Sequence, residues 1–335
     1  MLTTVVGSYP RIGDSSEKQK LRKIQEQYDR GEVDESALYD AWDDAIKEAV
    51  KEQVEAELDI ISDGQIVSTY QESFVASKLG IKLGGMIRYF DTNTFLRQPI
   101  IQKEIKWEYP ILDYDYSIAA CNSDKPVKAI IPGPYTIARF SKNEFYKSFD
   151  DLVLRLSEEL NNEVRHFDSK IKAPIIQINE PAILRNKQDI ELFLKAFTRL
   201  VDGIKESKIA LYTYFGDTDG ILDQLQELPL NIIGLDFIYN KKNFDLLKGF
   251  KKELGFGIVN ARNTKLEDKS DLIVSIIKAT EFIDPKNIYV NPSCGLIYLP
   301  RDTAKQKLVN MVEATKRAES LNERAKIEYD AYGRI

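Results

Sequence analysis

The chain is poor in the residues that carry metal and redox chemistry. Its 335 residues include two cysteines, Cys121 and Cys294, and one histidine, His166. Two cysteines do not make a disulfide framework. A zinc site built from thiolates and imidazoles uses three or four such ligands. All three residues would have to converge on one ion, so the composition argues against a zinc site of this kind.

Long apolar runs and an excess of positive charge are also missing. No segment is apolar for long enough to span a bilayer, and the opening MLTTVVGSYPRIG lacks the pattern of a secretory signal. The net charge is −6, from 47 basic and 53 acidic side chains, and the pI is about 5.3. Such a surface argues against non-specific binding to nucleic acid. We therefore expect a cytoplasmic protein whose partners are neither membranes nor nucleic acids.

Several well-known catalytic motifs are absent. The sequence contains neither the G-x-S-x-G elbow of serine hydrolases nor a phosphate-binding P-loop. No G-x-G-x-x-G follows the first apolar segment, which disfavours an open, doubly wound dinucleotide-binding sheet. His166 has no evident serine or cysteine partner, and we expect it to be structural.

What the chain does have is a regular alternation of short apolar segments and amphipathic stretches. Eight β-branched segments, each beginning apolar and ending polar, lie at residues 3–8, 59–64, 127–133, 174–180, 209–217, 231–237, 255–263 and 287–295. Helical stripes lie at 34–57, 149–169, 188–205, 218–227, 241–252, 269–282 and 302–322. Buried parallel strands that alternate with helices predict an α/β fold, a (β/α)8 TIM barrel. We expect one domain over residues 1–322 and a polar tail over 323–335.

One connection breaks the regular spacing. Residues 64–126, after the second strand, form an insertion too long for a simple loop. The alternating pattern over 88–109 predicts a hairpin laid over the barrel mouth. Tyr89, Phe95 and Trp107 are expected to be buried by it.

Polar side chains follow the predicted strands, and in such barrels the strand carboxyl ends form the working face. The residues expected to converge there are Ser8, Arg11, Asp63, Gln65, Thr136, Asn179, Glu180, Tyr212, Tyr214, Asp236, Asn260, Arg262, Ser293 and Cys294. The set suits a small polar ligand. Asp63, Glu180 and Asp236 are the candidates for acid–base catalysis. Glu180 could equally cap a helix or pair with Arg185, and the tyrosines could simply be packing.

These strand ends also carry the motifs of a known family. The motifs are GSYPRIG (7–13), RYFDTN (88–93), GPYT (133–136), QINEPAIL (177–184), TYFGD (213–217), GLDFI (234–238), GIVNARN (257–263) and PSCGLIYLP (292–300). On them the chain resembles cobalamin-independent methionine synthase over nearly its whole length. It is most similar to the amino-terminal, zinc-free barrel of that two-barrel enzyme, which helps to bind polyglutamylated methyltetrahydrofolate.

The departures from the family pattern concern the zinc and the substrate amine. The family's zinc-bearing barrel uses His-x-Cys, Glu and Cys at positions that here are Tyr212, Tyr214, Asp236 and Cys294. The resemblance therefore implies a degenerate zinc site and no metal cofactor. Zinc holds homocysteine as a thiolate, so we expect no methylation by this chain alone. The aspartate that holds the substrate amine in the family is Asn179 here.

The cationic positions of the family carry over as candidates. The segment after PRIG leaves Lys18 and Lys20, and Arg88 replaces a family lysine. The complete set of candidate ligand-binding residues is Arg11, Lys18, Lys20, Arg88, Asn179, Glu180, Tyr212, Tyr214, Asp236, Arg262 and Ser293. The ligand implied is a folate-type or other methyl-pterin donor.

We therefore expect a stand-alone barrel related to methionine synthase. It would bind the methyl-pterin donor or assist a separate zinc-bearing homocysteine methyltransferase core. Two alternatives stay open. One is a self-sufficient methyltransferase or lyase on the same scaffold, and the other is a non-catalytic barrel for protein interaction.

Overall fold

A ring of parallel strands forms the centre of the protein in a computed structural model that describes residues 1–332, with the side chains of all of these except 17, 241 and 324–332. The sheet order is β1-β10-β9-β8-β7-β6-β4, and every pairing is parallel. The strands are β1 (Leu2–Thr3), β4 (Ala129–Pro132), β6 (Ile175–Asn179), β7 (Lys208–Tyr212), β8 (Ile232–Asp236), β9 (Glu253–Val259) and β10 (Ile288–Pro292). Their residues are almost all buried.

The second predicted strand closes the ring between β1 and β4. The amides of Asp59 and Ile60 donate to the carbonyl of Thr3 at 3.2 and 3.1 Å. The amide of Ile61 donates to the carbonyl of Pro126 at 3.0 Å, and Ile61 forms a parallel bridge to Val127. The eight predicted segments therefore lie in sequence order around a closed barrel. The (β/α)8 prediction is confirmed.

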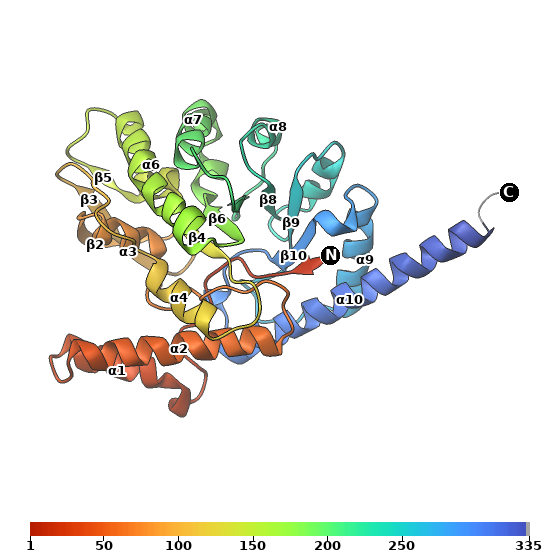
Figure 1. Cartoon of the computed structure of the whole chain (residues 1–335), viewed down its shortest axis with the longest axis horizontal. Coiled ribbons are helices and arrows are strands. Elements are labelled where there is room, and N and C mark those ends of the chain that lie inside the picture. The colour runs from red at the N-terminus through yellow and green to blue at the C-terminus, as the bar shows by residue number, and fades with distance from the viewer. Residues whose placement is uncertain (333–335) are drawn as a thin grey trace.

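Helices cover the outside of the barrel (Figure 1). They are α1 (Lys20–Asp29), α2 (Glu35–Glu55), α3 (Gln71–Lys78), α4 (Asp113–Cys121), α5 (Pro134–Phe140), α6 (Phe149–His166), α7 (Ile190–Leu200), α8 (Leu222–Gln226), α9 (Lys269–Thr280) and α10 (Arg301–Tyr332). Shorter 3-10 or π turns are η1 (Ser16–Gln19), η2 (Phe167–Ile171), η3 (Pro181–Arg185), η4 (Lys187–Asp189), η5 (Lys241–Leu247), η6 (Pro285–Asn287) and η7 (Leu296–Tyr298). Asp34 caps α2 as expected, because its carboxylate accepts from the amide of Ala37 at 3.0 Å.

Three helices differ from their predicted extents. The helix expected at 241–252 is the 3-10 turn η5, and the helix expected at 218–227 contracts to α8. The last helix runs to Tyr332, so most of the predicted polar tail 323–335 belongs to α10, and residues 333–335 lie outside the described residues. α10 extends away from the body (Figure 1). Within the described residues, no helix has the length and apolarity needed to cross a membrane.

The insertion between residues 64 and 126 has its own small sheet. Strands β2 (Lys82–Arg88) and β3 (Phe95–Ile101) form an antiparallel hairpin, and β5 (Lys142–Asn143) pairs with β3. The hairpin starts earlier than predicted, so that RYFDTN forms its tip. Tyr89 is buried, as expected, and Trp107 is half-buried. Phe95 is 50% exposed, so its predicted burial is wrong: it lies on the outer face of the hairpin.

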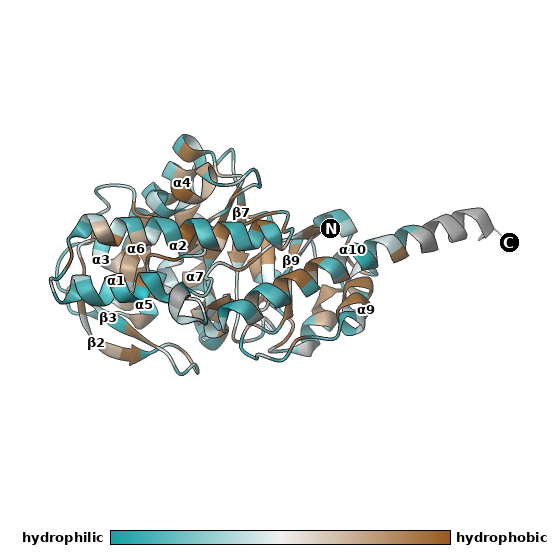
Figure 2. Ribbon diagram, turned by 90° about the horizontal axis from the view of Figure 1, so that it is seen from below, coloured by the Kyte–Doolittle hydropathy of each residue, from teal (hydrophilic) through white to brown (hydrophobic). Residues whose placement is uncertain are grey.

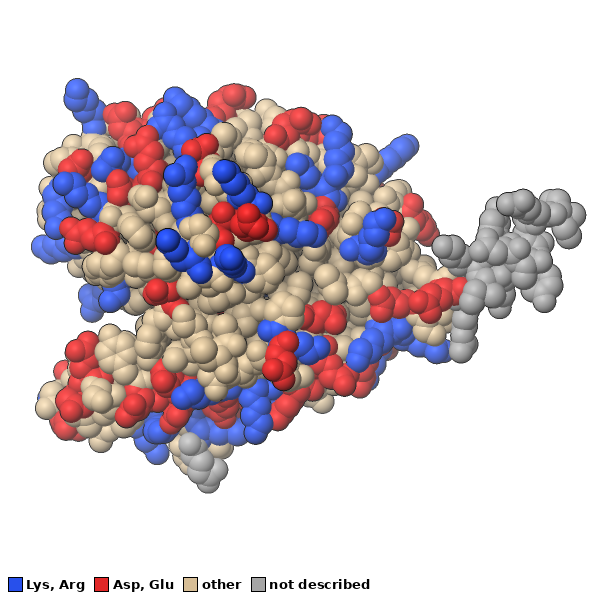
Figure 3. Space-filling view, in the orientation of Figure 1, with Lys and Arg blue, Asp and Glu red and all other residues tan. Residues whose placement is uncertain are grey.

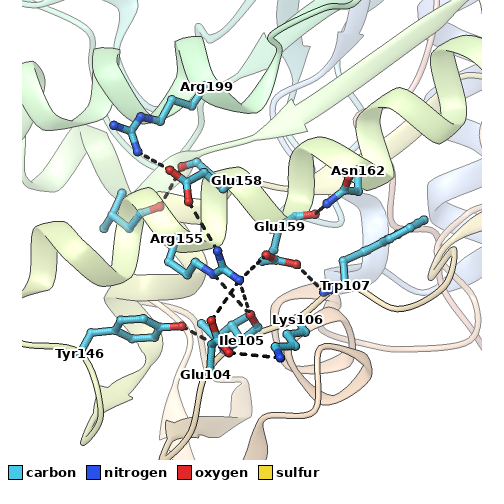
Figure 4. Close-up of polar contacts among 12 residues, drawn as sticks. Glu104, Ile105, Lys106, Trp107, Tyr146, Arg155, Glu158, Glu159, Asn162 and Arg199 are labelled. Carbon is cyan, nitrogen blue, oxygen red and sulfur yellow. Dashed lines mark hydrogen bonds and ion pairs between the residues drawn. The ribbon is translucent and has the colours of Figure 1, made fainter.

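The exit of the insertion is bound to α6 (Figure 4). The amide of Trp107 donates to Glu159 and its indole Nε1 donates to Glu163, both at 2.6 Å. The buried Glu163 also accepts from the amides of Ile111 and Leu112. Arg155 pairs with Glu159 at 2.7 Å. The insertion is thereby held against the barrel by charge-assisted hydrogen bonds.

Helices α1 and α2 form a helical arm along one edge of the molecule (Figure 1), and α2 also packs against α4 and α10 of the barrel. Helices α1 and α2 pack against each other, with their polar faces turned outward (Figures 1 and 2). The surface is hollowed between this arm and the body above it (Figure 3).

Candidate functional site

A narrow polar cavity lies at the carboxyl ends of the strands, under the insertion. Its lining residues are Ser8, Gln65, Thr69, Tyr70, Gln71, Glu72, Tyr89, Pro132, Asn179, Tyr214, Phe215, Gly295, Ile297 and Tyr298. The space inside that a water-sized sphere can occupy is about 40 Å³, enough for one or a few waters. The sequence predicted a pocket for a small polar ligand at this face, but the cavity leaves little free space in this structure.

The insertion supplies most of the hydrogen-bond acceptors in this cavity. The Glu72 carboxylate is buried and accepts from the hydroxyl of Tyr89 at 3.0 Å. Burial raises the pKa of Glu72. Gln71 is 93% buried, and its Oε1 has no hydrogen-bond partner, which is also true of the Tyr70 hydroxyl. Buried polar atoms are normally paired, so these groups favour a bound ligand with hydrogen-bond donors.

Glu180 supports the fold beside the cavity. Its two oxygens accept from the amides of Tyr135 and Thr136 at 2.9 and 2.8 Å and from the Thr136 hydroxyl at 2.6 Å. Glu180 therefore caps the amino-terminal end of α5. The sequence suggested a cap on the helix that follows Glu180, whereas α5 precedes it in the chain. A Cβ on Gly133 would lie 2.0 Å from the Glu180 Cδ, so only glycine allows this approach. Burial raises the pKa of Glu180 to about 7.

Asp236 is likewise occupied by backbone amides. Its carboxylate accepts from the amides of Phe215, Ile238 and Tyr239 at 3.3, 3.0 and 2.8 Å. Burial raises its pKa to about 6. Cys294 lies nearby and is fully buried, and loss of water raises the pKa of its thiol well above the usual value. Neither group lines the cavity.

The two tyrosines of strand β7 and its end lie in different places. Tyr214 lines the cavity, whereas Tyr212 lies in the barrel interior, where its hydroxyl donates to Asn291 at 3.3 Å. The ring of Tyr212 passes so close to Gly234 that a Cβ there would lie 2.4 Å from it. Lys128 stands over this ring at 5.0 Å and donates to the Val5 carbonyl. Burial lowers the pKa of Lys128 to about 7.

Asp63 faces away from the cavity, toward helix α4. Asp63 and Asp115 interact electrostatically, and loss of water raises the pKa of Asp63 to about 6. Arg11 beside them donates to the carbonyls of Ile66 and Val67 and to Thr69. Its guanidinium therefore fixes the start of the insertion.

The remaining candidate residues are spread over the rim and the surface. Lys18 and Lys20 pair with Asp302 and Asp44 at 3.2 and 2.5 Å. Arg88 donates to Thr92 and Asn93 in its own hairpin. Arg262 stacks on Phe215, 5.0 Å from the ring centre. Ser293 is buried, and its hydroxyl accepts from the amide of Ala261 at 3.4 Å.

A wider groove lies beside the cavity, between α1 and the mouth. It has a volume of about 990 Å³ and is lined by Pro10, Arg11, Ile12, Gly13, Asp14, Gln19, Leu21, Arg22, Gln25, Glu26, Thr69, Ile297, Tyr298, Leu299 and Pro300. Tyr298 and Thr69 line both the groove and the cavity. The groove is therefore a natural approach for a ligand larger than the cavity can hold.

The four positions that the family resemblance relates to zinc ligands lie in different surroundings. Tyr212 turns into the barrel, Asp236 is saturated by three amides, and the Cys294 thiol is held neutral by burial. Across the part of the chain that the structure describes, no three His, Cys, Asp or Glu side chains are grouped so that they could hold a metal ion. A single soft ligand with tyrosine oxygens is a poor donor set for zinc.

Sequence reasoning missed Glu72 and Gln71. Both lie in the insertion, where no strand pattern indicated a place in the site. Both begin the short helix α3, and their burial is visible only in the folded structure, so the sequence carried no signal for them.

The fold and the cavity define the class of protein: a (β/α)8 barrel with a polar cavity at the strand carboxyl ends. Comparison with known proteins adds the family. Residues 1–317 match the family described as "Cobalamin-independent synthase, Catalytic domain". The methionine synthase of Saccharolobus solfataricus is 34% identical over 319 residues, which cover 94% of this chain and 93% of that protein. The chain belongs to the cobalamin-independent methionine synthase family.

Further relatives agree with this placement. The methionine synthase of Sulfolobus acidocaldarius is 32% identical, over 93% of this chain and 91% of that protein. A B12-independent methionine synthase from Shewanella, solved in complex with selenomethionine, has the same fold with a TM-score of 0.81 and 18% identity, over 98% of this chain and 100% of that one. A methyltransferase from Methanosarcina mazei gives a TM-score of 0.60 at 14% identity, over 93% and 94% of the two chains.

Proposed function

We propose that this barrel serves methionine biosynthesis as a ligand-binding companion to a separate zinc-bearing homocysteine methyltransferase core. The observation that carries the proposal is the state of the four zinc positions, which offer one buried thiol, one saturated carboxylate and two tyrosines. A free thiol has a pKa of about 8.5 and is only a few per cent ionised at neutral pH. Without zinc, the chain has no evident means of making the homocysteine thiolate.

The cavity and the groove are proposed to bind different parts of the reaction's ligands. The cavity is lined by acceptors and by no lysine or arginine, which suits an ammonium group. Selenomethionine in the Shewanella protein supports an amino acid as the occupant. The larger groove is lined by Arg22, whose exposed ion pair with Glu26 could be exchanged for the anionic tail of a methyl-pterin donor.

A methionine-formation assay with methyltetrahydropteroyl-triglutamate and homocysteine tests the proposal. We expect no turnover by the chain alone, and turnover once a zinc-bearing core barrel is added. Arg22→Ala should weaken donor binding, while Arg199→Ala, an exposed arginine on α7, serves as the matched control. Turnover by the chain alone that a chelator abolishes would overturn the companion role.

A second candidate is a self-sufficient methyltransferase. The matching family description is that of a catalytic domain, and the Saccharolobus protein named methionine synthase has nearly the same length as this chain. Glu72 would then be the acid–base candidate, because it lines the cavity and burial raises its pKa. Chelator-resistant turnover by the chain alone, lost in Glu72→Gln, would favour this candidate.

A further inference from the structure

The tip of the β2–β3 hairpin lies over the cavity as a cover made of aromatic side chains. Tyr89 stacks on Phe140 with ring centres 5.3 Å apart, Phe90 meets Phe140 edge-to-face at 5.1 Å, and both contact Phe215. Phe140 and Phe215 belong to the barrel, at α5 and after β7. The tip therefore closes the mouth by contact with two neighbouring barrel loops.

Tyr89 lines the cavity and narrows it from the side of the hairpin. Its hydroxyl donates to Glu72 inside, and its ring stacks against Tyr70 at 4.9 Å. The Tyr89 hydroxyl is a hydrogen-bond donor among the acceptor groups that line the cavity. One of these acceptors, the Oε1 of Gln71, stays unpaired. A ligand with a donor group and Tyr89 would compete for the same space.

One ion pair joins the tip to the opposite side of the mouth. Asp91 pairs with Arg185, which follows β6, and the Arg185 guanidinium also stacks on Phe90 at 5.1 Å from the ring centre. Arg185, with Arg88 and Arg262 farther away, holds the pKa of Asp91 below its usual value. Phe90 adopts a left-handed backbone conformation with φ of 48°, which is unfavourable for a residue of its type.

We propose that the hairpin tip is a displaceable cover, in which Tyr89 plugs the cavity and the Asp91–Arg185 pair latches it shut. Ligand exchange requires the latch to open and the tip, residues 89–92, to swing off the mouth. The strained backbone at Phe90 and the partly exposed Asp91–Arg185 pair favour opening at the tip.

The buried Cys294 reports on this opening. It is fully buried just behind the cavity wall, because its chain neighbour Gly295 lines the cavity and so do Tyr214 and Tyr298, with which Cys294 interacts electrostatically. Cys121 is exposed, so Cys121→Ser leaves Cys294 as the single thiol of the chain. In this background, the rate of modification by methyl methanethiosulfonate, followed by mass spectrometry, measures how often the mouth opens.

Asp91→Asn and Arg185→Gln should each raise the modification rate about 3- to 10-fold, as expected for loss of a partly exposed ion pair and a cation–π contact. The matched control is Arg165→Gln, which breaks an exposed ion pair with Asp202 elsewhere on the protein and should change the rate less than about 2-fold. The charge-swapped double variant Asp91→Arg, Arg185→Asp should restore a rate near that of the parent. Unchanged rates in both single variants would overturn the proposal, and so would an equal increase in the control.

Discussion

The buried carboxylates of the barrel and of the insertion differ in the number and kind of their hydrogen-bond donors. In the barrel, Glu180 and Asp236 each accept three hydrogen bonds, five of these six from backbone amides. In the insertion, Glu72 accepts from one side-chain hydroxyl, that of Tyr89 on the movable tip. A carboxylate saturated by the backbone stabilises the fold, whereas one held by a displaceable group is free to bind a ligand. The comparison separates structural acids from a binding acid, although all three lie near the same mouth.

The largest expected effect tests the structural side of this comparison. Glu180→Ala leaves two backbone amides and a threonine hydroxyl without their acceptor, which should lower the free energy of unfolding by about 3–5 kcal/mol. Glu72→Ala removes a single acceptor and should cost at most about 1–2 kcal/mol. Urea denaturation followed by circular dichroism measures both. Equal losses would break the comparison, because they would make Glu72 as structural as Glu180.

The next effect concerns Lys128, a buried cation in the barrel interior with no carboxylate partner among its hydrogen bonds. Burial lowers its folded pKa to about 7 from an ordinary 10.5. Between these values the unfolded chain binds more protons, so the stability of the parent rises with pH over that window and this lysine destabilises the fold most below pH 7. Lys128→Met should stabilise the protein by about 2–3 kcal/mol at pH 6, after the lost hydrogen bond to Val5 is counted, and progressively less toward pH 10.

Thermal unfolding at pH 6 and pH 9.5 gives the measurement for Lys128→Met. Lys208→Met is a suitable control, because Lys208 pairs with Glu253 at the surface end of β7. A gain in stability that does not depend on pH would show that Lys128 is not a buried, titrating cation.

The barrel could be predicted from the sequence, whereas the details of the insertion could not, for a physical reason. Strand β4 and strands β6 to β10 are buried on both faces, so their apolar runs and polar ends are fixed by the barrel geometry and are readable in the sequence. The start of the hairpin was misplaced and Phe95 was expected inside, because β2 is a largely exposed strand whose alternation follows no buried face. Glu180 and Tyr212 were correctly placed at strand ends, but the direction of each side chain depended on Gly133 and Gly234 on neighbouring strands. Contacts of this kind join residues from different segments, so the sequence of a single segment does not reveal them.

The variant Glu72→Gln tests whether the Glu72 carboxylate binds a ligand. If the cavity takes the ammonium group of an amino acid, the lost charge should weaken L-methionine binding about 10-fold, or about 1.4 kcal/mol. Because burial raises the pKa of Glu72, binding to the parent should strengthen as pH rises and the carboxyl ionises. Isothermal titration at two pH values measures this, with the exposed Glu144→Gln as control. Equal affinities for parent and variant would remove Glu72 from the site.

The smallest expected effect comes from restoring the family's aspartate at position 179. Asn179 lines the cavity, and its Oδ1 accepts from the buried Gln177 at 2.7 Å, so this oxygen is already engaged inside the barrel. Asn179→Asp adds a carboxyl group to the cavity that Glu72 also lines, and like charges in one cavity raise one another's pKa. Part of the new carboxyl therefore stays protonated near pH 7, and the gain in L-methionine affinity should be only about 2- to 3-fold there. At pH 9 the carboxyl is ionised, and the gain should grow to about 5-fold. Isothermal titration of parent and variant at both pH values gives the two ratios. A gain that is the same at both values, or a loss, would show that the ammonium group does not lie beside residue 179, and that the cavity orients its ligand through the insertion alone.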